Sequence, residues 1–125
     1  MFYFAKMASK KTLFKIDGVV LELSEKQLSN LERSLFYQLA QRKIDSVEED
    51  GFILIDRQST YVPWINKWLT NQEIPNSHYT LIHLLEEAQF YNLEQLADKI
   101  QQRLVELVSV QYNGTQTKLN KFNGT

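Results

Sequence analysis

Two histidines and one glutamate have a spacing that suits a metal ion. His83 and Glu87 are four residues apart, so a helix places them on one face, and His78 is nearby. Three scattered ligands with no partners to orient them are weak support for a metal site. We therefore interpret them as solvated side chains on a helix surface. The adjacent Glu86 and Glu87 point about 100° apart on a helix, so they do not form an acid–base pair. We expect no cofactor and no metal.

The acidic segment 45–51 has a superficial likeness to a calcium-binding loop. If Gly51 takes the sixth position of such a loop, Arg57 takes the twelfth, where a bidentate glutamate is needed. The chain also has no cysteine, no Gly-x-Ser-x-Gly nucleophile elbow and no glycine-rich phosphate loop. These observations predict that the protein is not an enzyme.

The composition is typical of one soluble globular domain. The chain has 125 residues, of which 43% are hydrophobic and 23% charged. A net charge of −1 lacks the basic excess with which proteins neutralise nucleic-acid phosphates, so no nucleic-acid partner is expected. No apolar run approaches the ~20 residues of a membrane span, so no membrane association is expected either. The chain lacks both cysteine and a recognisable signal-peptide core, so we expect the cytoplasm as its location.

A β-hairpin begins the elements that would position these residues. Segments 12–16 and 19–23 have strand-like patterns, and the Asp17-Gly18 pair between them is a strong hairpin signal, because the tight turn needs positive φ. Ser24 and Gln27 then fit a capping box that opens a helix. One face of this single expected helix carries leucines at helical spacing, namely Leu28, Leu31, Leu35 and Leu39.

A third strand follows the turn at Gly51. Residues 52–55 read Phe-Ile-Leu-Ile, a continuous apolar run that predicts a strand covered on both faces. Ser59 or Thr60 then caps a helix that has Pro63 in its first turn. The apolar positions of this helix are Val62, Ile65, Trp68 and Leu69. We expect Trp68 in the core and Trp64 exposed toward a partner.

Two more helices are predicted on either side of Asn92. The first has an apolar stripe of Leu81, Leu84, Leu85, Ala88 and Tyr91, and the second has Leu93, Leu96, Ile100, Leu104 and Leu107. After glycine, asparagine best tolerates the left-handed backbone of so sharp a reversal, so Asn92 is expected at positive φ. Residues 112–114, Tyr-Asn-Gly, predict the end of the last helix.

The chain resembles the BTB/POZ fold in its potassium-channel-tetramerisation (KCTD-like) form. Segment 14–18 keeps one glycine of a strand-ending pair, and the strand 53–55 is followed by the family's Asp56-Arg57 pair. Segment 84–96 is nearly intact, with Asn92 in place of the usual glycine. The family's Arg-Thr-Gly-like turn is replaced by Thr70-Asn-Gln72. The resemblance implies an α+β fold with a small, mainly three-stranded sheet flanked by four to five helices.

The resemblance also implies a division of the chain and a function. Residues 1–10 would be an N-terminal extension, 11–110 the BTB/POZ domain and 111–125 a flexible polar tail. Family members assemble protein complexes, so we expect a homo-oligomer, a closed ring of four or five subunits, with Asp56 and Arg57 at the subunit contact.

An alternative function is that of a substrate adaptor for a cullin-RING ubiquitin ligase. Such an adaptor would bind the cullin through the middle helices and the loop after them. The candidate partner residues are Trp64, Thr70, Asn71, Gln72 and Glu73. The zinc site that some channel members carry between subunits needs cysteine, and this chain has none.

Overall fold

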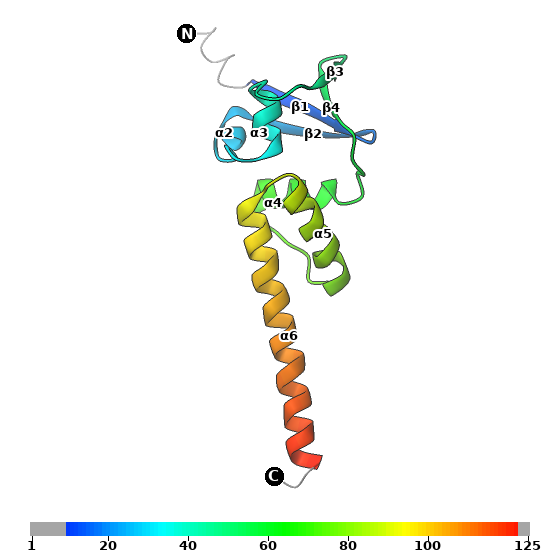
Figure 1. The fold of residues 1–125 in the computed structure, drawn as a ribbon, viewed down its shortest axis with the longest axis vertical. Helices are drawn as coiled ribbons and strands as arrows, with labels where there is room; N and C mark the ends of the chain where they lie inside the picture. Colours follow the sequence, from blue (N-terminus) through cyan, green and yellow to red (C-terminus); the bar gives the residue numbers. More distant parts are fainter. Residues whose placement is uncertain (1–9, 123–125) are drawn as a thin grey trace.

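The structure, a computed structural model, describes the backbone of residues 10–122 and the side chains of residues 10–109. Apart from Lys10, the predicted N-terminal extension lies outside this range. The elements, in chain order, are β1 (Lys11–Ile16), β2 (Val19–Ser24), α2 (Glu25–Ser29), α3 (Leu35–Ala40), β3 (Val47–Glu49), β4 (Phe52–Ile55), α4 (Val62–Asn71), α5 (His78–Phe90) and α6 (Glu94–Phe122). The sheet lies at one end of the molecule and α6 extends away from the other (Figure 1). The α+β fold that the sequence predicted is confirmed.

The sheet has four strands in the described residues, in the order β2-β1-β4-β3. β1 pairs with β2 in antiparallel fashion and with β4 in parallel fashion, and β3 pairs with β4 in antiparallel fashion. The predicted hairpin at Asp17-Gly18 is confirmed, because both residues have positive φ, 45° and 79°. A second hairpin of the same kind turns at Asp50-Gly51, with φ of 53° and 84°.

The sheet differs from the expectation in two details. The acidic segment before Gly51 contains a short strand, β3, which makes four strands rather than three. β4 is covered on one face only, because Ile53 and Ile55 are buried whereas Phe52 and Leu54 are half-buried. The physical reason is that the helices pack on one side of the sheet, where Phe14, Ile16, Leu21 and Leu23 also point into the core.

The helix expected after the hairpin is split in two. The capping box is present: Ser24 Oγ accepts a hydrogen bond from the Gln27 N–H at 3.1 Å, and Gln27 Oε1 accepts one from the Ser24 N–H at 2.9 Å. The first helix ends at Ser29, and the buried Ser34 caps the next one by accepting a hydrogen bond from the Tyr37 N–H at 3.2 Å. A serine side chain that bonds to the backbone favours a helix start over a helix interior, which explains the break.

The remaining helices differ from prediction at their ends. α4 has Pro63 in its first turn as expected, but its N-cap is Tyr61, which makes no side-chain capping bond, rather than Ser59 or Thr60. Asn92 has φ of 55°, as predicted, and separates α5 from α6. α6 does not end at Asn113 and Gly114 but continues to Phe122. A glycine inside a helix costs about 1 kcal/mol relative to alanine, which weakens a helix without ending it.

The core joins the sheet to the helices through stacked aromatic rings. The Phe14 and Phe36 rings meet edge to face with centroids 5.1 Å apart, and the Phe36 and Tyr91 rings stack at 4.6 Å. Tyr91 is fully buried, so the end of α5 is held against α3. Within residues 10–122, no helix has the length and apolarity that a membrane crossing requires.

Candidate interaction surface

Arg57, directly after β4, forms an ion pair inside the chain. Its Nε donates to Glu87 Oε1 at 3.1 Å, and its Nη2 donates to Glu87 Oε2 at 2.7 Å. Gln58 Nε2 also donates to Glu87 Oε2, at 3.3 Å. The Glu87 side chain is 2% exposed and that of Arg57 is 30% exposed. We call this pair the Arg57–Glu87 clamp, because it ties the end of β4 to the last turn of α5.

Two aromatic residues, Phe90 and Tyr91, lie beside the clamp. The guanidinium carbon of Arg57 lies 4.1 Å from the centroid of the Phe90 ring. The hydrogen bond to Glu87 raises the pKa of Arg57 above its ordinary value, so the guanidinium stays charged. Burial raises the pKa of the neighbouring Tyr91 hydroxyl, and the charge of Glu87 adds to the effect. The Tyr91 hydroxyl is buried and finds no hydrogen-bond partner among the described residues.

Sequence reasoning missed the role of Glu87. A signal for it was present, because Glu87 lies on the apolar stripe of α5 between Leu84 and Tyr91. A carboxylate on a core-facing stripe is rarely fully buried unless a cation pairs with it. Arg57, predicted together with Asp56 at a subunit contact, is therefore engaged within its own chain.

Asp56 is placed differently from its neighbour Arg57. It is exposed and borders a shallow cavity of about 380 Å³ on the sheet. The other residues that line this cavity are Lys15, Asp17, Gly18, Val47, Leu54 and Ile55. The structure thus leaves Asp56 open to contact by another molecule.

The face of the sheet beside Asp56 carries exposed apolar side chains. Strand register aligns Val20, Lys15, Leu54 and Val47 in one row across all four strands. Val47 is 66% exposed and Val20 is 44% exposed. We call this row, together with Phe52 and Asp56, the outer sheet face. Sheets with one solvated face usually alternate apolar residues inward and polar residues outward, so the exposed valines of this face depart from the usual pattern.

The predicted partner residues on α4 and the following loop form a second exposed region. Thr70, Asn71 and Glu73 are exposed, and Gln72 ends the helix with φ of 57°. Gln72 lines a cavity of about 230 Å³ whose apolar residues are Leu31, Trp68 and Leu69. A further cavity of about 270 Å³ shares Leu31 and Trp68. We call the two together the α4 groove.

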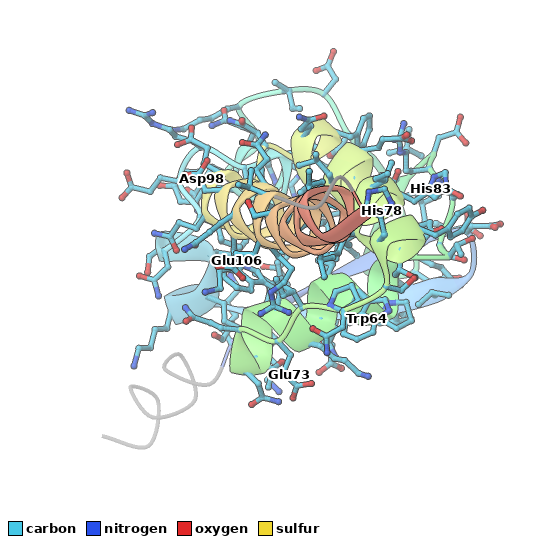
Figure 2. All side chains as sticks on the ribbon, turned by 90° about the horizontal axis from the view of Figure 1, so that it is seen from below. Trp64, Glu73, His78, His83, Asp98 and Glu106 are labelled. Carbon is cyan, nitrogen blue, oxygen red and sulfur yellow. The ribbon has the colours of Figure 1, made fainter. Side chains whose placement is uncertain are left out.

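The two tryptophans of α4 differ in burial, and only Trp68 lies as expected. Trp68 is 8% exposed and belongs to the core. Trp64 is half-buried, with Lys67 Nζ lying 4.5 Å from the centroid of its ring. Figure 2 places Trp64 and Glu73 on the α4 side of the molecule. Trp64 is therefore less exposed than the sequence suggested.

The histidines do not form a metal site with Glu87. His83 packs against Tyr79, with ring centroids 4.3 Å apart, and its Nδ1 lies 4.0 Å from Glu86 Oε1. Glu87 points instead to Arg57. Among the residues that the structure describes, no group of His, Cys, Asp and Glu is arranged to hold a metal ion. Figure 2 shows His78 and His83 on the α5 side of the molecule.

Comparisons with known proteins agree with this fold. A family model described as BTB/POZ domain matches residues 13–100. An uncharacterized protein of Caenorhabditis elegans is 28% identical over 93 residues, which cover 71% of this chain and 36% of that protein. The chain thus spans about a third of the length of this relative. BTB/POZ domains are protein-interaction modules. The chain belongs to the BTB/POZ domain family, of the potassium-channel-tetramerisation type.

Proposed function

We propose that this protein is a non-enzymatic module that binds further copies of itself, as a closed ring of four or five subunits in the cytoplasm. The observation that supports this most is the outer sheet face, which leaves Val47 and Val20 exposed beside Asp56. β3 is also an edge strand of the sheet, and an edge strand has unpaired backbone N–H and C=O groups to which another chain can bind. Head-to-tail contacts must close into a ring or they propagate into filaments.

The proposed contact is centred on Asp56 and Val47 rather than on the Asp56-Arg57 pair. Arg57 is engaged with Glu87 at 2.7 Å, so its reversal to glutamate would damage the fold as well as any contact. Asp56 and Val47 can be changed with less risk, because both are exposed. They are therefore the informative positions for an experiment on assembly.

Light scattering coupled to size exclusion tests the proposal on the full chain at tens of micromolar. The expected mass is four or five times the 14.7 kDa of one chain, and a monomer would refute the proposal. Asp56→Lys and Val47→Glu are expected to lower the mass. The matched controls are Asp98→Lys on α6 and Ile82→Glu on α5, an exposed acid and a 38% exposed apolar residue away from the sheet. A loss of assembly in Ile82→Glu alone would place the contact on α5 instead.

A second candidate function is cullin binding, and the α4 groove favours it. The groove has apolar residues, Trp68 and Leu69, and its rim at Gln72 continues into the exposed residues that the family resemblance assigns to partners. Binding of a purified cullin amino-terminal domain is expected to weaken in Leu69→Lys and to persist in Asp98→Lys. Absence of binding at high micromolar concentration would set this function aside.

A further inference from the structure

Helix α6 carries two separate apolar stripes. The first faces the domain: Leu96 and Ile100 are fully buried, and Leu104 and Leu107 are half-buried against the core. The second begins with Val105 and Val108, which are 64% and 54% exposed. Two exposed valines three residues apart on a helix lie on the same side of it, so they form the start of a continuous apolar surface.

The sequence continues this second stripe with the spacing of a coiled coil. Its positions are Val105, Val108, Tyr112, Thr115, Leu119 and Phe122, separated alternately by three and four residues. Alternating spacings of three and four are the a and d positions of a heptad repeat, which helices bury against one another. The α6 backbone is helical throughout this range, to Phe122. We call these six positions the α6 seam.

The domain leaves Val105 and Val108, the two seam positions whose side chains the structure describes, exposed. α5 has 13 residues and α6 has 29, so α5 reaches along only about half of its neighbour. Figure 1 shows α6 continuing well past the end of α5. The projecting part includes Asn113, Gly114 and Thr117, which have poor helix propensity. Such a segment needs packing against another surface to stay helical in water.

We propose that the α6 seam packs in parallel against the α6 seam of a second copy of this chain. The positions that flank the seam are Leu104, Ser109, Gln111, Gln116 and Lys118, of which only Lys118 is charged. Identical helices therefore meet with little repulsion between like charges at these flanks. Copies in a closed ring are related by rotation about one axis, so their α6 helices point the same way along it. This inference rests on the proposed self-association and adds a second contact to it.

Cross-linking of single-cysteine variants tests the parallel contact, because the chain has no cysteine of its own. In the full-length chain, Val108→Cys places a thiol on the seam, and Val105→Cys places one a turn earlier. The matched control is Glu106→Cys, which lies between them in sequence, is exposed and is on another side of the helix. Under mild oxidation the seam variants are expected to form disulfide-linked dimers about tenfold faster or more than the control, because packing holds their thiols at high effective concentration.

The outcomes separate this inference from the proposed function. An oligomer by light scattering, with equal cross-linking rates at positions 106 and 108, would overturn the α6 contact and leave self-association intact. A chain that is monomeric and does not cross-link would overturn both. Circular dichroism of each variant checks that the domain is folded before its rate is compared. Faster cross-linking at both seam positions than at position 106 supports the contact.

Discussion

Replacement of Arg57 by methionine is expected to destabilise the fold by about 3 kcal/mol, because it leaves a buried carboxylate without its cation. The Glu87 side chain is 2% exposed and, among the described residues, would keep only the 3.3 Å hydrogen bond from Gln58. Breaking a fully buried pair costs about 3–5 kcal/mol. We take the lower end, because Arg57 is 30% exposed and water can reach its side of the pair.

A double-mutant cycle separates the ion pair from the other contacts of Arg57. Glu87→Gln removes the buried charge but keeps the shape of the side chain. In that background Arg57→Met is expected to cost only about 1 kcal/mol, for the lost contact with Phe90 and a neutral hydrogen bond. The coupling between the two positions is therefore expected to be about 2 kcal/mol.

Urea denaturation followed by circular dichroism measures each free energy of unfolding. All variants must be compared at one protein concentration, since self-association adds to apparent stability. Arg33→Met is the matched control: its pair with Glu94 is 3.4 Å long, with side chains 80% and 51% exposed, so its loss is expected to cost less than about 0.5 kcal/mol. If Arg57→Met costs the same with glutamate and with glutamine at position 87, the reasoning about the clamp is refuted.

Three further predictions follow from single residues. Tyr91→Phe is expected to be neutral or stabilising by up to about 1 kcal/mol at neutral pH, because its buried hydroxyl lacks a partner among the described residues. Burial raises the pKa of Tyr91 in the folded state, so the folded state is destabilised relative to the unfolded state as pH rises above about 10, where the unfolded tyrosine ionises. Tyr91→Phe should therefore lessen the loss of stability at alkaline pH that pH-dependent melts measure. Asn92→Val is expected to cost about 1–2 kcal/mol more than Asn92→Gly, since φ is 55°, although either loses the 2.7 Å bond from Asn92 Nδ2 to the Arg33 carbonyl. A melt in which Val is the better tolerated would contradict this. Gly51→Ala is expected to cost about 1 kcal/mol in a thermal melt from backbone strain alone, because φ is 84° and an added Cβ meets nothing within 4 Å; an unchanged melting temperature would remove the argument for strain in this hairpin.

Local signals in the sequence determined most of the elements. Asp17-Gly18 predicted the first hairpin because few residue pairs adopt positive φ at two successive positions. Ser24 and Gln27 predicted a helix start through reciprocal bonds that involve only neighbouring residues. Asn92 predicted the break between α5 and α6 for the same kind of reason. Each of these features depends on backbone conformation within a few residues, so the sequence suffices for it.

Tertiary structure decided which side chains meet and which faces stay open. The pairing of Arg57 with Glu87 joins residues thirty positions apart, and no local pattern names the partner. β3 has three residues, all exposed, which is too short a segment for its sequence to predict a strand. It is a strand because it pairs with the edge of β4. The exposure of Asp56 and Val47 likewise depends on which side of the sheet the helices cover. Burial depends on how the whole chain packs. The sequence therefore identified Asp56 and Arg57 as a pair of interest, but only the fold shows that Asp56 is exposed whereas Arg57 is bound to Glu87.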